Sequence, residues 1–284
     1  MPILELSEAR EQMVRHHLAA RGIRDPAVLA AMRSVPREAF LPPELEEFAY
    51  ADAPLPIERG QTISQPYIVA LMTAAAALRP GDRVLEVGTG SGYAAAILAR
   101  IAHEVYTVER HEELARVATE RLARLGFANV SVRHGDGMLG WPEHAPYDAI
   151  IVAAGGPKVP EALRDQLAPG GRLVIPVGDG RTVQRLLRVT RAADGRLHEE
   201  ELGDVRFVPL IGAQGWMPEP SEWNGHALQV PSRPATLAHL IREVAEPLES
   251  IDDQDLGALL DRVSASRLVL IGRASCRERV FRTV

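Results

Sequence analysis

The sequence has a single cysteine, Cys276, among its 284 residues. One thiol cannot form an intrachain disulfide, and it cannot build a cysteine-rich metal site. The histidines His103, His111, His134 and His144 lie at the ends of expected helices and strands, without the regular spacing of metal ligands. We therefore expect neither a disulfide framework nor a metal centre.

The sequence also lacks an excess of positive charge and long apolar runs. The formal net charge is -6, so the composition does not indicate a basic surface for binding a nucleic acid or an anionic membrane. No apolar run reaches the roughly 18 residues that a membrane-spanning helix needs. The N-terminal residues "MPILELSEAR" do not have the basic and then apolar pattern of a signal peptide. These absences together predict a cytoplasmic protein.

The first 79 residues predict a helical arm. We expect Ser7 to cap a helix that runs to about Ala20 and closes at Gly22, and Asp25 to cap a second helix. A proline-rich irregular stretch then leads to "GQTISQPYIVALM", residues 60–72. There, Ser64 can cap a helix whose first turn holds Pro66.

From residue 80 the pattern changes to strands that alternate with helices. We expect strands at 82–88, 104–109, 129–137, 147–156, 172–178 and 183–191, with helices at 93–101 and 111–126 and a helix followed by a turn over 160–171. Such alternation is typical of an α/β fold, a Rossmann-like, doubly wound and mainly parallel sheet with helices on both faces. Ligands of such sheets bind at the carboxyl ends of the strands, where the strand order reverses.

A glycine-rich loop follows the first of these strands. In "VLEVGTGSGYAA" the glycines are Gly88, Gly90 and Gly92. Their G-x-G-x-G spacing differs from the G-x-G-x-x-G dinucleotide fingerprint, which argues against an NAD-dependent oxidoreductase. Tight strand-to-helix turns use glycine in any case, so the triplet alone is weak evidence for a ligand.

Three carboxylates near the ends of successive strands sharpen the interpretation. Glu86 precedes the glycine loop, where it would repel a pyrophosphate but suits a cofactor that carries an amine and a sulfonium. Glu109 ends the second strand and can accept hydrogen bonds from two ribose hydroxyls, and Asp136 in "HGDG" can accept from an adenine amine. Their arrangement around one glycine loop predicts an S-adenosylmethionine site in a class I methyltransferase fold.

The chain resembles the protein-L-isoaspartate O-methyltransferase family from Met13 to Trp216. The resemblance rests on "MVRHHLAARGIRDPAVLAAMRSVPREAFLP", "AYADAPLPIERGQTISQPYIVALM", "VLEVGTGSGYAAAIL", "HGDG" and "FVPLIGAQGW". Many methyltransferases share the glycine loop, whereas "GQTISQP" with its proline-rich approach is specific to this family. The resemblance implies methyl transfer from S-adenosylmethionine to the free carboxylate of L-isoaspartyl residues in damaged proteins and peptides. It also favours a monomer.

The resemblance implies site residues as well. The active-site serine of the family falls on Ser64, which we expect to orient one carboxylate oxygen, although a role as helix cap alone stays open. The implied cofactor-binding residues are Thr62, Ile63, Gln65, Glu86, Gly88, Gly90, Gly92, Glu109, Asp136 and Gly137. "AAGGP" after the fourth strand either lines the mouth of the pocket or simply turns the chain, and Trp216 can merely close the core.

The end of the chain departs from the family. We divide the chain into an arm and active-site segment (1–79), a methyltransferase core (80–217) and a linker with a partial appendage (218–272). The appendage resembles the opening of an erythromycin-esterase-like domain without its catalytic run. Residues 273–284 are interpreted as an artefactual tail, because "IGRASCRERV" resembles one reading frame of a common sequencing adapter.

Two alternative functions stay open at this point. A small-molecule methyltransferase would share only the cofactor-binding half, and the "GQTISQP" block argues against it. A non-catalytic module that binds altered peptides would not need the intact glycine loop with Glu109 and Asp136.

Overall fold

The computed structural model describes residues 3–178, 183–213 and 215–216. The predicted appendage (218–272) and the predicted artefactual tail (273–284) lie outside the described residues. The helical arm and the sheet that follows it share one hydrophobic core in these described ranges.

The N-terminal arm begins with a long helical segment whose geometry changes along its length. Helix α1 spans Ile3–Gln12, and π-helical and 3-10 turns continue it over Met13–Leu18 and Ala19–Arg21. The segment ends at Gly22, which adopts a left-handed conformation (φ 98°), as the sequence predicts. Ser7 lies inside α1, so the prediction that it caps this helix is wrong.

Helix α2 spans Pro26–Ser34 and begins as the sequence predicts. The Asp25 carboxylate accepts hydrogen bonds from the amides of Ala27 (2.8 Å) and Val28 (3.2 Å). Such a cap contributes about 1 kcal/mol to the stability of a helix. Short 3-10 turns at Arg37–Phe40 and Pro43–Phe48 then form the proline-rich stretch.

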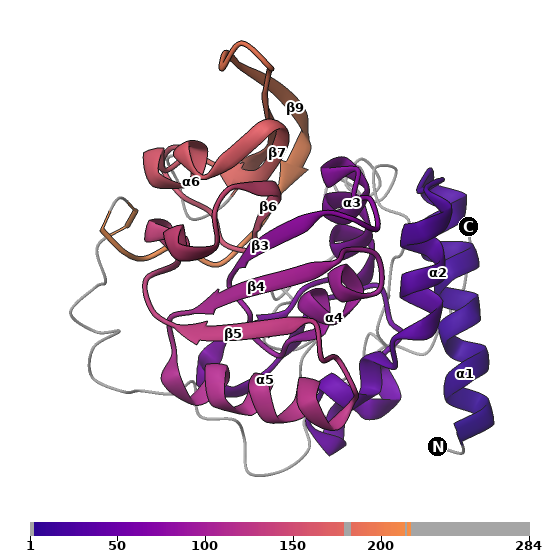
Figure 1. Ribbon diagram of the computed structural model, residues 1–284. Helices are drawn as coiled ribbons and strands as arrows, with labels where there is room; N and C mark the ends of the chain where they lie inside the picture. Colours follow the sequence, from indigo (N-terminus) through magenta and orange to yellow (C-terminus); the bar gives the residue numbers. More distant parts are fainter. Residues whose placement is uncertain (1–2, 179–182, 214, 217–284) are drawn as a thin grey trace, which may run out of the picture. The chain divides into compact units, whose positions relative to one another are not determined.

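A seven-stranded sheet forms the centre of the part of the chain that the structure describes (Figure 1). Its strand order is β5-β4-β3-β6-β7-β8-β9. The bounds are Arg83–Val87 (β3), Glu104–Glu109 (β4), Val130–His134 (β5), Tyr147–Val152 (β6), Leu167–Val177 (β7), Gln184–Arg191 (β8) and Leu197–Val205 (β9). The first five pair in parallel, whereas β8 and β9 are antiparallel to their neighbours. The mainly parallel, Rossmann-like sheet is therefore confirmed.

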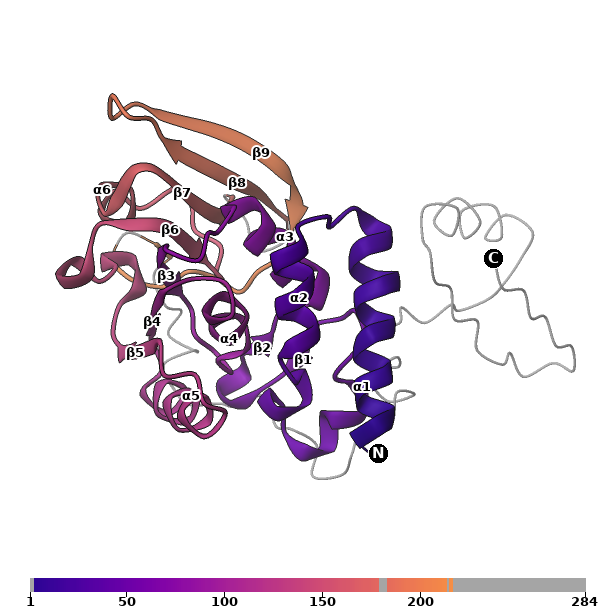
Figure 2. The same cartoon turned by 45° about the vertical axis from the view of Figure 1, so that its right-hand side comes forward.

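Helices cover both faces of the sheet. On one face lie α3 (Pro66–Ala76), α4 (Tyr93–Ala99) and α5 (Glu112–Arg124), whose buried side chains join the cluster that also contains the arm. On the other face lies α6 (Glu161–Asp165), whose Leu163 packs with Leu85 and Ile150. Both views place α1 and α2 on the outer side of α3 and α4 (Figures 1 and 2).

The structure corrects the predicted pattern in two places. Within the helix and turn predicted over 160–171, α6 forms the helix, but strand β7 already begins at Leu167, where a turn is expected. Strand β9 was not predicted, because almost all of its residues are exposed, four of the nine are acidic, and they carry no apolar alternation. Arginines on β8 pair with these acids across the two strands, for example Arg185 with Glu201 at 3.4 Å.

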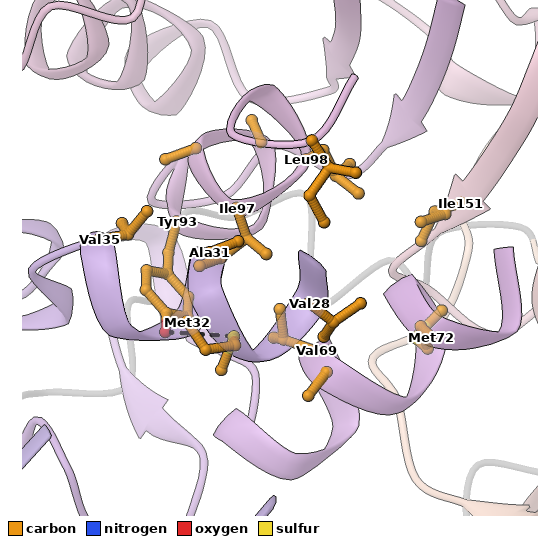
Figure 3. Close-up of a cluster of buried hydrophobic side chains, with 14 of the residues drawn as sticks. Val28, Ala31, Met32, Val35, Val69, Met72, Tyr93, Ile97, Leu98 and Ile151 are labelled. Atoms are coloured by element: carbon orange, nitrogen blue, oxygen red, sulfur yellow. Dashed lines mark hydrogen bonds between the residues drawn. The ribbon is translucent and has the colours of Figure 1, made fainter. Parts of the chain in front are cut away.

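The helical arm is held against the sheet by apolar side chains from several helices (Figure 3). Val28, Ala31 and Met32 of α2 meet Val69 of α3 and Ile97 of α4 in one buried cluster. Fully burying such a side chain stabilises the fold by roughly 1.5–3 kcal/mol. The helix that follows the polar segment 60–65 is therefore fixed from two sides, by the arm and by the sheet.

Candidate active site

A cavity of about 800 Å³ opens at the carboxyl ends of β3, β4 and β6. Strand β3 pairs with β4 on one side and with β6 on the other, so the cavity lies where the strand order reverses. Its walls come from the segment 59–64, the glycine loop, the end of β4, the loop after β6 and the segment 208–211. A cavity of suitable size for a cofactor therefore lies at the edge of the sheet where the sequence predicts a ligand site.

The glycine loop forms the floor of the cavity between β3 and α4. Gly88 and Gly90 line it, together with Thr89 and Ser91. Gly92 stands at the N-cap of α4 with φ 88°, and a Cβ atom there would lie 3.3 Å from Leu122 of α5. Gly92 therefore permits a left-handed turn and close packing of two helices, and it does not line the cavity.

Glu109, at the end of β4, is tied to the glycine loop. One oxygen of its carboxylate accepts a hydrogen bond of 2.8 Å from the Gly90 amide, and the other accepts one of 2.9 Å from the His111 amide. The side chain lines the cavity and Glu109 is only 5% exposed. A carboxylate oxygen can accept two hydrogen bonds, so each oxygen keeps one acceptor position for a ligand hydroxyl.

Glu86 is fully buried beneath the glycine loop. Its Oε2 accepts a hydrogen bond of 2.5 Å from Thr107, whose hydroxyl lies 2.6 Å from that of Thr89. The Oε1 atom has no hydrogen-bond partner among the described residues. Burial raises the pKa of the Glu86 carboxyl to about 8, while the Thr107 hydrogen bond opposes the shift. The Thr107 hydroxyl thus connects a buried, protonated Glu86 to Thr89 in the cavity wall.

Asp136 and Gly137 follow β5 and differ in their relation to the cavity. Gly137 lines it, but the Asp136 carboxylate accepts hydrogen bonds of 2.9 Å from the amides of Met138 and Ala213. Asp136 thereby connects the end of β5 to the segment that follows Ile211, which lines the opposite wall. A Cβ atom at Gly137 would lie 2.4 Å from Cγ1 of Val87, so close packing requires glycine here.

The polar segment before α3 forms a small hairpin over the glycine loop. Strand β1 (Leu55–Pro56) pairs with β2 (Thr62–Ile63), and the turn between them carries Arg59 in a left-handed conformation (φ 60°). Arg59 forms an exposed ion pair of 2.6 Å with Glu113 at the start of α5. The hairpin therefore spans the cavity from the arm to α5.

Ser64 lies directly after β2 and lines the cavity. The prediction that it caps α3 is wrong, because Gln65 stands at the N-cap position and makes no side-chain capping hydrogen bond. The Asp52 carboxylate accepts from the Tyr67 amide (3.0 Å) in the first turn instead. Among the described residues, none is a hydrogen-bond partner of the Ser64 hydroxyl, which leaves it available to a ligand.

The segment 208–211 closes the remaining side of the cavity. It pairs with the loop after β6, because the Gly155 amide donates to Val208 O (2.8 Å) and the Leu210 amide donates to Gly155 O (2.8 Å). Trp216 donates its indole N–H to the same Gly155 carbonyl at 3.1 Å. Within "AAGGP", Ala153 and Ala154 line the cavity, whereas Gly155 carries this pairing.

The cavity brings together some of the predicted site residues. Those that line it are Thr62, Ile63, Ser64, Gly88, Gly90, Glu109 and Gly137. Those that do not are Gln65, Glu86, Gly92 and Asp136, and their roles toward a cofactor stay predictions. Sequence reasoning missed further lining residues, among them Arg59, Thr89, Tyr93, His111 and the run 208–211. Most of these residues lie within a few positions of a predicted site residue, and this closeness in sequence is the signal that could have identified them.

The residues present fit S-adenosylmethionine. Glu109 offers two acceptors to a ribose diol, and Val87, Val108 and Ile211 supply apolar walls for an adenine ring. On the side of the glycine loop, the polar Thr89 lines the cavity, and its hydroxyl is connected through that of Thr107 to Glu86. The part of the chain that the structure describes holds no cluster of three or more metal-ligating side chains. It also contains no helix that is long and apolar enough to cross a bilayer.

Comparison with known proteins agrees with this geometry. The family model described as Protein-L-isoaspartate(D-aspartate) O-methyltransferase (PCMT) matches residues 8–215. Protein-L-isoaspartate O-methyltransferase 2 of Pelobacter propionicus is 64% identical over 207 residues, which cover 73% of this chain and 92% of that protein. Protein-L-isoaspartate O-methyltransferase 1 of Rhodopseudomonas palustris (strain HaA2) is 61% identical, over 74% of this chain and 87% of its own.

Solved structures give the same result. A protein-L-isoaspartate O-methyltransferase structure matches with a TM-score of 0.65 and 33% identity, over 72% of this chain and 67% of that chain. A beta-aspartate methyltransferase (PCMT) from Plasmodium falciparum, solved in complex with S-adenosyl-L-homocysteine, matches with a TM-score of 0.62 and 30% identity. That match covers 71% of this chain and 98% of that chain. With its Rossmann-like sheet, its glycine loop and its polar hairpin, the chain belongs to the protein-L-isoaspartate(D-aspartate) O-methyltransferase family.

Proposed function

We propose that this cavity is where the protein transfers a methyl group from S-adenosylmethionine to the free carboxylate of L-isoaspartyl residues in damaged proteins and peptides. One observation carries the proposal: Ser64, the glycine loop and Glu109 line a single cavity. In this arrangement the acceptor carboxylate lies on the Ser64 side. The ribose of the cofactor lies on the Glu109 side.

When bound, S-adenosylmethionine supplies an electrophilic methyl group attached to a sulfonium. The acceptor carboxylate is ionised at pH 7, so the protein does not need a general base. Its task is to align the acceptor oxygen and to exclude water. Holding reactants in the right geometry can lower a barrier by roughly 7–11 kcal/mol.

Ser64 orients the acceptor. Its hydroxyl donates a hydrogen bond to one oxygen of the carboxylate, which leaves the other oxygen free to attack. The serine is not a nucleophile, because none of the described residues is a hydrogen-bond partner of its hydroxyl and no base therefore activates it. The free hydroxyl in the cavity wall supports this role.

Glu109, Gly88 and Gly90 hold the cofactor. The Gly90 amide and the His111 amide fix the Glu109 carboxylate so that its remaining acceptor positions face the cavity. Burial lowers the pKa of His111, although Glu109 opposes that shift. Thr62 and Ile63 cover the cofactor from the hairpin. Gln65, Glu86, Gly92 and Asp136 support these groups from outside the cavity wall.

The proposal also covers the cellular location, the oligomeric state and the binding partners of the protein. The chain acts as a cytoplasmic monomer on isoaspartyl proteins and peptides, with no nucleic acid or membrane as partner. The net charge of -6 supports the absence of a nucleic acid or anionic membrane as partner, because the protein offers no general attraction for polyanions.

The test is methylation of an isoaspartyl peptide with labelled S-adenosylmethionine, followed by treatment with base. A carboxyl methyl ester releases its label as volatile methanol, whereas a methylated nitrogen retains it. Base-labile label on the peptide supports the proposal. Label that appears only on a small molecule would favour the alternative, a small-molecule methyltransferase.

A further inference from the structure

The Asp52 carboxylate, at the base of the active-site hairpin, accepts hydrogen bonds from three donors. Its Oδ1 accepts from the Tyr67 amide (3.0 Å), and its Oδ2 accepts from the Gln65 side-chain amide (2.8 Å) and from the Arg21 guanidinium. The Asp52 side chain is only 12% exposed. A carboxylate with this many donors is held in one orientation.

The Gln65 side chain donates two hydrogen bonds to Asp52. Its Nε2 donates to the Asp52 carboxylate and also to the Asp52 backbone carbonyl, at 2.9 Å. The two residues stand 13 positions apart, so these hydrogen bonds close the base of the hairpin. Gln65 does not line the cavity, and its side chain serves the hairpin instead.

Arg21 covers the outer side of this junction. Its guanidinium carbon lies 3.6 Å from the centre of the Tyr67 ring, while the same group donates to Asp52. Arg21 closes the helical segment of the arm, just before Gly22. The arm is therefore linked through Asp52 to the first turn of α3.

Ser64 stands between two anchored residues. On its N-terminal side, Ile63 pairs with Leu55 in the β1–β2 ladder and is 3% exposed. On its C-terminal side is Gln65. Because its own hydroxyl has no hydrogen-bond partner among the described residues, the position of Ser64 depends on these two neighbours.

We propose that Asp52, acting through Gln65, positions Ser64 for methyl transfer. The inference rests on the proposed role of Ser64. Asp52 and Gln65 are positioning residues, since neither lines the cavity. A displacement of about 1 Å at a reacting centre can cost on the order of 100-fold in rate, so a loosened hairpin base should be visible in kcat.

A double-mutant cycle with Gln65→Ala and Ser64→Ala tests the coupling. Gln65→Ala should lower kcat roughly 10- to 100-fold, while the Kd for S-adenosylhomocysteine changes less than about threefold. In the Ser64→Ala background the same change should cost less than about twofold, because Gln65 acts through Ser64. Gln12→Ala, at an exposed glutamine of α1, is the matched control and should retain wild-type rates.

Each outcome of the cycle decides the inference. Non-additive effects support it. Additive effects of Gln65→Ala and Ser64→Ala overturn it while leaving the role of Ser64 intact. An unchanged kcat in Gln65→Ala overturns it as well.

Amide hydrogen exchange separates this inference from the proposed function. In Gln65→Ala and Asp52→Asn, exchange of the amides of residues 60–65 should be at least about tenfold faster than in the wild type and in Gln12→Ala. Unchanged exchange in that segment overturns the anchoring whatever the activity. If the wild type transfers no methyl group to an isoaspartyl peptide, the proposed function fails, and the exchange experiment still decides whether Asp52 anchors the hairpin.

Discussion

The carboxylate of Glu109 accepts a hydrogen bond of 2.8 Å from the backbone amide of Gly90. This contact joins the end of β4 to the loop that follows β3, so the two walls of the cofactor cavity are built as one unit. It also fixes which acceptor positions of the carboxylate remain for a ligand. Binding of the cofactor should therefore depend strongly on the charge at residue 109.

Glu109→Gln should weaken the binding of S-adenosylhomocysteine by about tenfold or more. The amide loses the charge, and one of its two terminal atoms becomes a donor that faces a backbone N–H. A hydrogen bond to a charged group contributes about 1.5–3 kcal/mol. Isothermal titration calorimetry measures the Kd. Glu104→Gln, at the half-buried start of the same strand, is the control, and a Kd for Glu109→Gln within twofold of it would refute the assignment.

Ser64→Ala should lower kcat/KM for an isoaspartyl peptide roughly 10- to 100-fold. The loss corresponds to one hydrogen bond to a carboxylate. Since Ser64 does not cap α3, the thermal midpoint should stay within about 2 °C of the wild type. Initial rates and a thermal melt check both statements. Undiminished kcat/KM would show that the hydroxyl does not orient the acceptor.

The stability of the cofactor-free protein should fall between pH 4.5 and 8 because of Glu86. Burial raises the pKa of this carboxyl from 4.5 to about 8, so the folded state binds a proton that the unfolded state has released. The contribution of Glu86 to the free energy of unfolding is then largest below pH 4.5 and decreases as the pH rises through this window. The loss is on the order of a few kcal/mol.

Urea unfolding at pH 5 and pH 8 measures this dependence. Glu86→Gln cannot ionise, so the difference in stability between variant and wild type should grow in favour of the variant as the pH rises. Groups other than Glu86 cancel in this comparison. A difference that stays constant from pH 5 to pH 8 would mean that Glu86 is already ionised in the folded state.

Gly137→Ala should destabilise the fold by roughly 1–3 kcal/mol. The new Cβ atom would lie 2.4 Å from Cγ1 of Val87, and a β-branched residue in a central strand has little freedom to move. Val87→Ala removes the obstacle, so the double variant should be more stable than the two separate losses imply. Equilibrium unfolding of the four proteins measures the coupling, and strictly additive losses would contradict it.

Much of the fold could be predicted from the sequence because local signals agreed with the final packing. Asp25 before Pro26 marks a helix start, and mainly apolar stretches such as 84–87, in which only Glu86 is charged, mark buried parallel strands. Strand β9 escaped prediction because an edge strand has little to bury, and cross-strand ion pairs with β8 replace an apolar face. The helix start was wrongly predicted at Ser7, because a serine on the exposed side of a helix has the same appearance in sequence as a helix cap.

Site residues could be predicted only where they lie at or just after the ends of strands in the parallel sheet. Glu109 and Gly90 belong to adjacent strand ends of a parallel sheet, so their proximity follows from topology. The Asp52–Gln65 and Asp136–Ala213 contacts do not, because each joins segments whose separation in sequence says nothing about their distance in space. The same reason explains why Ser64 was mistaken for the cap that Asp52 provides from a distance.

Specific methylation of isoaspartyl residues is tested by comparing an isoaspartyl peptide with its normal aspartyl twin. Both are incubated with labelled S-adenosylmethionine and the wild-type protein, and base-labile methyl groups are counted on each. The account predicts methylation of the isoaspartyl peptide and none of the aspartyl twin. Equal labelling of both peptides, or labelling of neither while S-adenosylhomocysteine still binds, would contradict it.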